Sequence, residues 1–94
     1  MTVAGTARWR VKPPDQLVWR EVASEVVILD LRTSMYWTLN GSAAVLWLTL
    51  AEGATAEQLA ERLVETYGIE AEVAARDVSA FLGSCHAQDL LEEA

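Results

Sequence analysis

The hydrophobic pattern of the chain changes near residue 40 from a period of two to a period close to four. Residues 17–22 and 26–31 are rich in β-branched and aromatic side chains, and Ala23-Ser24-Glu25 has the length of a hairpin connection. A second short break at residues 32–34 precedes residues 35–39. The pattern predicts three antiparallel strands in a meander.

The third predicted strand carries aromatic side chains on both faces. Alternation places Met35, Trp37 and Leu39 on one face and Tyr36 and Thr38 on the other. We therefore expect neither face of this strand to be purely solvated.

The segment before these strands leaves two interpretations open. Three apolar residues alternate with three basic ones in residues 7–12, ahead of Pro13-Pro14. Residues 1–16 form either a loosely held arm whose charges keep a sheet edge from self-association, or an additional edge strand with a basic outer face.

Two helices are predicted directly after the strands. Asn40-Gly41-Ser42 supplies capping residues before residues 43–48, which are apolar nearly all round, so this helix should be central and buried. Thr55 and Gln58 have the spacing of a capping box for a second helix that ends at Gly68. Its outer face carries like charges at i, i+4 spacing, each pair costing roughly 0.2–0.5 kcal/mol unless a partner relieves it. These charges are Glu57, Glu61 and Glu65, and we expect Arg62 to relieve some of the repulsion.

A third helix is predicted from about Ala71 to about Ala87, with an unusually wide apolar band. Val78 and Phe81 cannot point the same way as both Ala75 and Leu82. Part of the band should therefore border a second surface in addition to the neighbouring helix.

Three strands followed by three helices predict an α+β fold, a winged helix-turn-helix with a three-stranded antiparallel sheet. With 94 residues, 52% of them hydrophobic and 22% charged, the chain has room for one folded domain. We place this domain at residues 17–91, after the arm and before an acidic tail at residues 92–94.

The net charge of −7 is concentrated in the helical half. Through Arg32 there are five basic and four acidic residues, whereas from Thr33 onward two basic residues accompany ten acidic ones. In residues 69–94, Arg76 alone faces six acidic residues, which disfavours contact between the third helix and phosphates. We therefore expect no nucleic-acid partner.

No membrane segment or export signal is expected either. The most apolar stretch, residues 43–51, is far shorter than the ~20 residues that span a bilayer. A single cysteine cannot form an intrachain disulfide, and residues 1–10 lack the apolar core of a secretory signal. These features indicate a cytoplasmic protein.

The side chains that carry chemistry are few and do not converge. Cys85 and His86 are adjacent on one predicted helix, so they diverge by about 100° and cannot form a nucleophile and base pair. A metal needs three or four converging ligands, and the five glycines form no phosphate-binding loop. We expect no cofactor, no metal and no catalytic residue, and hence not an enzyme.

Residues 27–40, with their strand, turn and strand, resemble PqqD-like proteins, the peptide-recognition elements of ribosomally made natural products. Residues 41–47, residues 58–63 with Tyr67-Gly68, and residues 77–82 with Leu90-Leu91 keep the order of the family's three helices and exit. The likeness covers about residues 17–91 and is greatest to the separate leader-recognition component of lasso peptide pathways. Ser34 and Asp89 stand where glycine is common in the family, which leaves the geometry of both turns open, and Cys85 stands where leucine is common.

The resemblance implies that a precursor's leader segment lies as an added strand against the third strand, in a groove whose other wall is the third helix. The strand side would be Met35, Tyr36, Trp37, Thr38 and Leu39. The helix side would be Ala75, Val78, Ser79, Leu82 and Cys85, with Arg76 or Asp77 at the rim.

The leading hypothesis is therefore a non-catalytic RiPP recognition element that binds the leader of a lasso-peptide precursor by β-strand addition and delivers it to a separate cysteine-type leader peptidase. Whether a cyclase is a further partner stays open. The alternatives are a small winged-helix DNA-binding regulator, which would depend on Arg8, Arg10 and Lys12, and a structural subunit whose exposed strand pairs with a second copy.

Overall fold

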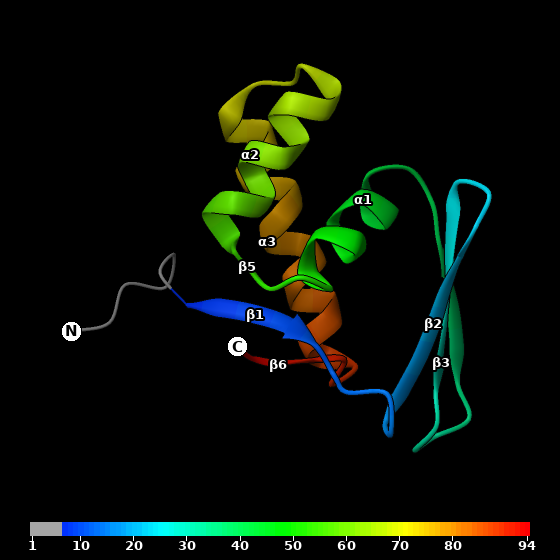
Figure 1. The fold of residues 1–94 in the computed structure, drawn as a ribbon. Coiled ribbons are helices and arrows are strands. Elements are labelled where there is room, and N and C mark those ends of the chain that lie inside the picture. Colours follow the sequence, from blue (N-terminus) through cyan, green and yellow to red (C-terminus); the bar gives the residue numbers. More distant parts are fainter. Residues whose placement is uncertain (1–6) are drawn as a thin grey trace.

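The chain folds into three helices and two small antiparallel sheets, and the computed structural model describes residues 7–94 (Figure 1). The α+β class predicted from the sequence is confirmed. In chain order the elements are β1 (Arg8–Val11), β2 (Leu17–Val22), β3 (Glu25–Asp30), β4 (Tyr36–Leu39), α1 (Gly41–Leu50), β5 (Ala54–Thr55), α2 (Ala56–Tyr67), α3 (Ala71–Ala87) and β6 (Leu91–Glu93).

The first sheet is the predicted meander, with strand order β2-β3-β4. Leu17 lies opposite Asp30 across β2 and β3, and Leu29 lies opposite Tyr36 across β3 and β4. The hairpin turn consists of Ala23-Ser24 alone, because Glu25 already pairs with Val22. The meander leaves β4 at one margin of the sheet.

The second sheet has the order β5-β1-β6, so β1 is its central strand and not an addition to the meander. Trp9 pairs with Ala54 on one side and with Glu93 on the other. An ion pair of 2.9 Å between Arg10 Nε and Glu92 Oε2 joins β1 to β6. The expected acidic tail thus contributes to β6, and residues 1–6 of the expected arm lie outside the described residues.

The helices begin and end close to their predicted positions. The capping box of α2 is present, since Gln58 N donates to Thr55 Oγ1 at 3.1 Å and Thr55 N donates to Gln58 Oε1 at 3.0 Å. Gly68 ends α2 in the left-handed conformation with φ of 67°. Asn40 precedes α1 in an extended conformation, but its side chain makes no capping hydrogen bond.

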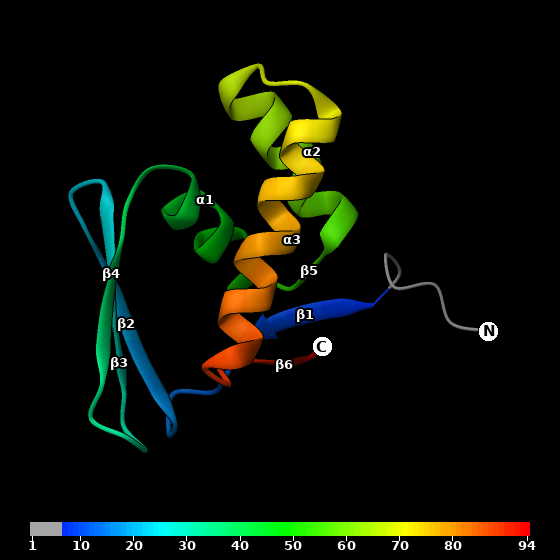
Figure 2. The same cartoon turned by 180° about the vertical axis from the view of Figure 1, so that it is seen from behind.

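Helix α1 is the central element that the sequence predicted. In both views it lies between the β2-β3-β4 sheet and the α2–α3 pair (Figures 1 and 2). Trp47 and Leu50 on α1 are fully buried, together with Ile28 from the sheet and Leu63 from α2. None of the helices within residues 7–94 is long and apolar enough to cross a membrane.

The outer face of the meander carries an exposed apolar row. The strand registers place Val18 beside Leu29 and Leu29 beside Tyr36, and all three side chains are exposed, Tyr36 by 69%. This row ends at β4, so its last member borders the margin of the sheet.

Two turns that the sequence left open adopt conformations that favour glycine. Ser34, between β3 and β4, has φ of 64°, and Asp89, after α3, has φ of 58°. A left-handed non-glycine residue costs roughly 1–2 kcal/mol. The chain keeps both turns in spite of this strain.

We predict that Ser34→Gly stabilises the protein by about 0.5–1 kcal/mol, because relief of the left-handed strain exceeds the extra chain entropy of glycine. Urea unfolding measures the change. The matched control is Ser24→Gly in the hairpin turn, where φ is not positive and glycine should destabilise instead. A loss of stability in Ser34→Gly as large as in the control would contradict the prediction.

Candidate functional site

Strand β4 has an open edge within the described part of the chain. It pairs with β3 on one side only, and β1 lies in the other sheet. Asp30 N donates to Met35 O at 2.8 Å, so the backbone groups of Met35 and then Trp37 face β3 by alternation. The N–H and C=O groups of Tyr36 and Thr38 therefore point to the open edge and are free to pair with another strand.

A groove of about 410 Å³ lies between β4 and the C-terminal half of α3, which we name the β4–α3 groove. Its strand wall is Trp37 and Leu39, and both side chains are half-buried. The floor includes Ile28 and Trp47, which are buried. The helix wall is made by Phe81, Ser84, Cys85, Ala87 and Gln88, with Ala43 and Leu90 completing the lining.

The helix-side residues predicted from the sequence are divided by the structure. Cys85 lines the β4–α3 groove. Asp77 lies four residues before Phe81 and so shares its helix face, above the groove. Four others line a different groove, between α2 and α3: Ala75, Val78, Ser79 and Leu82. Arg76 is exposed and lines neither groove.

Four residues of the helix wall were missed from the sequence: Phe81, Ser84, Ala87 and Gln88. Phe81 and Ser84 are three residues apart and share one face of α3, and Gln88 is the capping residue that follows the helix. The side chains of Val78 and Leu82 are buried in the core, so they pack against other core residues and do not line the β4–α3 groove. The available signal was the width of the apolar band: Phe81 lies on the side of the band that Val78 and Leu82 leave free.

Cys85 contributes an apolar surface to the groove and not a reactive group. Its residue is 4% exposed, and burial raises the pKa of the thiol to about 11. The thiol is therefore neutral near pH 7 and behaves as a small hydrophobic side chain. No cluster of three or more metal-binding side chains occurs among residues 7–94.

The floor of the groove contains an aromatic pair and one unsatisfied donor. Trp47 meets Trp19 edge to face, with ring centroids 6.3 Å apart and ring planes at 84°. The indole Nε1 of Trp47 is buried and has no hydrogen-bond acceptor among the residues described. A buried donor without a partner is uncommon in proteins, and this one belongs to a residue that lines the groove.

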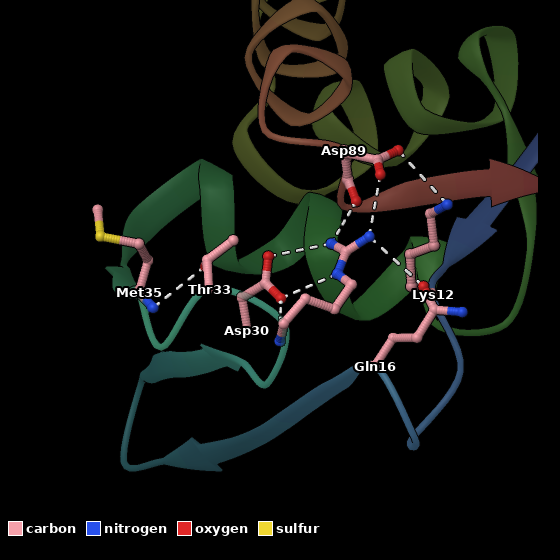
Figure 3. A network of polar contacts seen from close by, with 7 residues as sticks. Lys12, Gln16, Asp30, Thr33, Met35 and Asp89 are labelled. Carbon is pink, nitrogen blue, oxygen red and sulfur yellow. Dashed lines mark hydrogen bonds and ion pairs between the residues drawn. The ribbon is translucent and has the colours of Figure 1, made fainter.

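One guanidinium joins the two walls of the groove at one end. Arg32 Nε donates to Asp30 Oδ1 at 2.9 Å and Arg32 Nη2 donates to Asp30 Oδ2 at 3.0 Å. The same group donates from Nη1 to Asp89 Oδ2 at 2.9 Å and from Nη2 to the Asp89 carbonyl at 2.7 Å. Figure 3 shows Asp30 and Asp89 both reaching this guanidinium, with Lys12 close to Asp89. The turn before β4 is thus tied to the residue that follows α3.

This Arg32 clamp alters the acidity of Asp30. The hydrogen bonds from Arg32 hold the pKa of the Asp30 carboxyl below its ordinary value of 3.8, although burial opposes the shift. Asp30 is 1% exposed, and Arg32 also donates to it from its backbone N at 2.9 Å. Because the charged form is favoured in the folded chain, the clamp stabilises the fold above the ordinary pKa and loses this effect as the pH falls below it.

Comparisons with known proteins identify similar chains. The family described as Coenzyme PQQ synthesis protein D (PqqD) matches residues 25–91. A solved structure of TbiB1 in complex with the TbiA(beta) leader peptide is 28% identical, with a TM-score of 0.81, and covers 88% of this chain and 94% of its own. A lasso peptide synthetase B1 complexed with the leader peptide is 27% identical, with a TM-score of 0.77, and covers 89% and 96%. A comparison with curated proteins gives no match.

We predict that Asp30→Asn lowers stability at pH 7 and flattens its dependence on acid, because the amide cannot lose a charge at low pH. Urea unfolding at pH 7, 5 and 3, followed by tryptophan fluorescence, measures both effects. The control is Asp15→Asn, an exposed aspartate outside the clamp, which should keep the wild-type slope. Identical slopes in wild type and Asp30→Asn would contradict the assignment.

Proposed function

The chain belongs to the PqqD family, and on that premise we propose that it is a non-catalytic RiPP recognition element that binds the leader of a lasso-peptide precursor. This membership confirms the resemblance found in the sequence. The observation that carries the proposal is the open edge of β4 beside the apolar β4–α3 groove. It is supported by two similar structures that are described as complexes with leader peptides.

We propose that the leader binds by β-strand addition to β4. The backbone groups of Tyr36 and Thr38 at the open edge supply hydrogen bonds that do not depend on the peptide's sequence. Selectivity comes from alternate side chains of the added strand. Those on one face enter the groove between Trp37 and Phe81, and those on the other extend the exposed row that ends at Tyr36.

The proposed binding residues follow from this geometry. On the strand side they are the predicted Met35, Tyr36, Trp37, Thr38 and Leu39. On the helix side they are Cys85 from the prediction and Phe81, Ser84 and Gln88 from the structure, with Asp77 at the rim.

We propose further that the captured leader passes to a separate cysteine-type leader peptidase. The chain's one cysteine, Cys85, has a raised pKa and is surrounded by core residues, so it is unsuited to nucleophilic attack. The resemblance to lasso pathway components supports a second protein as the source of the protease. A cyclase as a further partner stays an open part of the proposal.

We keep the winged helix-turn-helix description of the fold as a proposal. The alternative function, DNA binding through the basic side chains of residues 8–12, is weakened by the ion pairs that these side chains form. Arg10 pairs with Glu92, and Lys12 lies 3.4 Å from Asp89, so two of the three basic side chains are already partnered. Arg8 donates to the Gly53 carbonyl. A gel shift that persists at ~150 mM salt would favour the alternative nevertheless, since contacts to a few phosphates fade with salt.

We predict that Thr38→Pro weakens binding of the synthetic leader by about tenfold, because proline removes an N–H that faces the open edge. Proline is tolerated on an edge strand when the lost donor points outward, so folding should be preserved. Isothermal titration calorimetry measures the affinity, and thermal unfolding checks the fold. The control, Thr38→Ala, keeps the N–H and should bind within about twofold of wild type. Equal affinities in all three proteins would exclude strand addition at β4.

We predict that Phe81→Ala lowers the affinity for the leader peptide by about tenfold, because the substitution removes an aromatic wall of the β4–α3 groove. The same titration with Ala75→Glu, on the opposite flank of α3, decides which flank binds. If Ala75→Glu lowers the affinity for the leader more than Phe81→Ala does, the leader binds the flank of α3 predicted from the sequence. The assignment to the β4–α3 groove would then fail.

A further inference from the structure

A second and larger groove, of about 1130 Å³, lies between α2 and α3, on the flank of α3 that faces away from β4. We name it the α2–α3 groove. Its walls are mostly small apolar side chains, including Ala60 and Val64 from α2 and Ala75 from α3. One end is closed by Trp9 and His86, whose ring centroids are 4.4 Å apart in an edge-to-face arrangement. Binding of a leader strand at β4 leaves this groove unoccupied.

The α2 rim of the groove is acidic. Glu57, Glu61 and Glu65 all line it and are exposed, and none forms an ion pair with another residue in the range 7–94. The opposite rim carries Ser79 and Gly83 and no charge. Because like charges at i, i+4 spacing repel, the row lowers the stability of α2 by roughly 0.2–0.5 kcal/mol per pair until cations approach it. The groove therefore matches an occupant with an apolar face and a cationic flank.

The secondary structure of the walls determines that of the occupant. Both walls are helices whose backbone groups are already bonded along their own axes, so neither offers an edge to an extended strand. An occupant in an apolar groove must then satisfy its own backbone, which a helix does. The glutamate row repeats at nearly every turn over eight residues, or about 12 Å, so lysine or arginine at the same spacing would match it. The small residues Ala75, Ser79 and Gly83 allow the helix to approach closely.

A second copy of this chain is a poor occupant. A two-fold dimer through this groove would place the same patch on both partners and bring the two glutamate rows together. With a net charge of −7 on each chain, the juxtaposition is repulsive. A positively charged partner avoids both problems.

We propose that the α2–α3 groove is a docking surface for an amphipathic helix of a partner protein, with an apolar stripe and a row of lysine or arginine along one flank. The assignment does not depend on which peptide occupies β4. It gives the chain two binding surfaces on opposite flanks of α3 that can be occupied at the same time.

The test uses the full chain and a labelled 18-residue synthetic helix with a leucine and alanine stripe and lysines at i, i+4 and i+8. Two control peptides are a version with glutamates in place of the lysines and a scrambled version of equal charge. Fluorescence anisotropy at ~150 mM salt should show binding of the amphipathic lysine peptide only. Equal binding of the scrambled peptide would reduce the interaction to general electrostatics and overturn the proposal.

Variants of the chain locate the contact. A triple variant should bind the lysine peptide about tenfold more weakly, because it loses three partly exposed charge contacts. Its substitutions are Glu57→Gln, Glu61→Gln and Glu65→Gln. The matched control removes three acidic charges elsewhere, by Asp15→Asn, Glu21→Gln and Glu25→Gln, and should have less than a twofold effect. Ala75→Arg, which fills the groove and adds a positive charge, should abolish binding. An equal loss in the control triple variant would overturn the proposal.

Two further measurements test whether something other than a partner helix occupies the α2–α3 groove, and a third distinguishes this proposal from the proposed leader binding at β4. If sedimentation of the free chain shows a dimer that Ala75→Arg disrupts, the groove belongs to a second copy. If deletion of residues 1–6 raises the affinity for the lysine peptide, the groove belongs to the chain's own N-terminal segment. Either result overturns the proposal. Thr38→Pro should leave the lysine peptide unaffected, so a failure at β4 and a failure at the α2–α3 groove give different results.

Discussion

The Arg32 clamp ties the turn before β4 to the residue that follows α3, and the arrangement of the β4–α3 groove rests on this tie. An open strand edge beside an apolar helix is an unstable arrangement on its own, because either surface would be better buried. Asp30 and Asp89 hold one guanidinium between the turn before β4 and the turn after α3. Trp47 and Ile28 fill the space beneath. The groove is therefore formed by the chain's own contacts, and a preformed surface has a lower ordering cost for any ligand that binds it.

The strain in the two turns belongs to the same constraint. Ser34 and Asp89 both adopt left-handed conformations that glycine would adopt more easily. Asp89 forms contacts that glycine could not form, because its carboxylate accepts a hydrogen bond from Arg32 and lies near the amine of Lys12. Ser34 offers no hydrogen bond of its side chain in compensation among the contacts of residues 7–94. The clamp and the core thus hold a turn that local preference alone would not select.

Local signals predicted most of the fold, whereas the second sheet and the flank of α3 that lines the β4–α3 groove required tertiary information. The capping box at Thr55 and the left-handed Gly68 depend on neighbours in the sequence, and both are present. Strand β5 has only two residues and β6 only three, and their partner β1 is more than forty residues away from either, so no local pattern specifies the pairing. The strand side of the proposed site was implied by the family resemblance, and alternation divided its residues between the two faces of the strand. The helix side was implied in the same way, but a wide apolar band on α3 does not say which of its flanks faces α2 and which faces β4.

Helix α3 separates two surfaces that require different secondary structures of whatever binds them. On one flank, β4 presents unpaired backbone groups, so an occupant gains most by being extended. On the other flank both walls are helical and carry an acidic rim, so an occupant gains most by being helical and cationic. The two requirements exclude one another, and a segment suited to one groove is poorly suited to the other. The two surfaces that we propose would let one small chain hold two different partners at the same time.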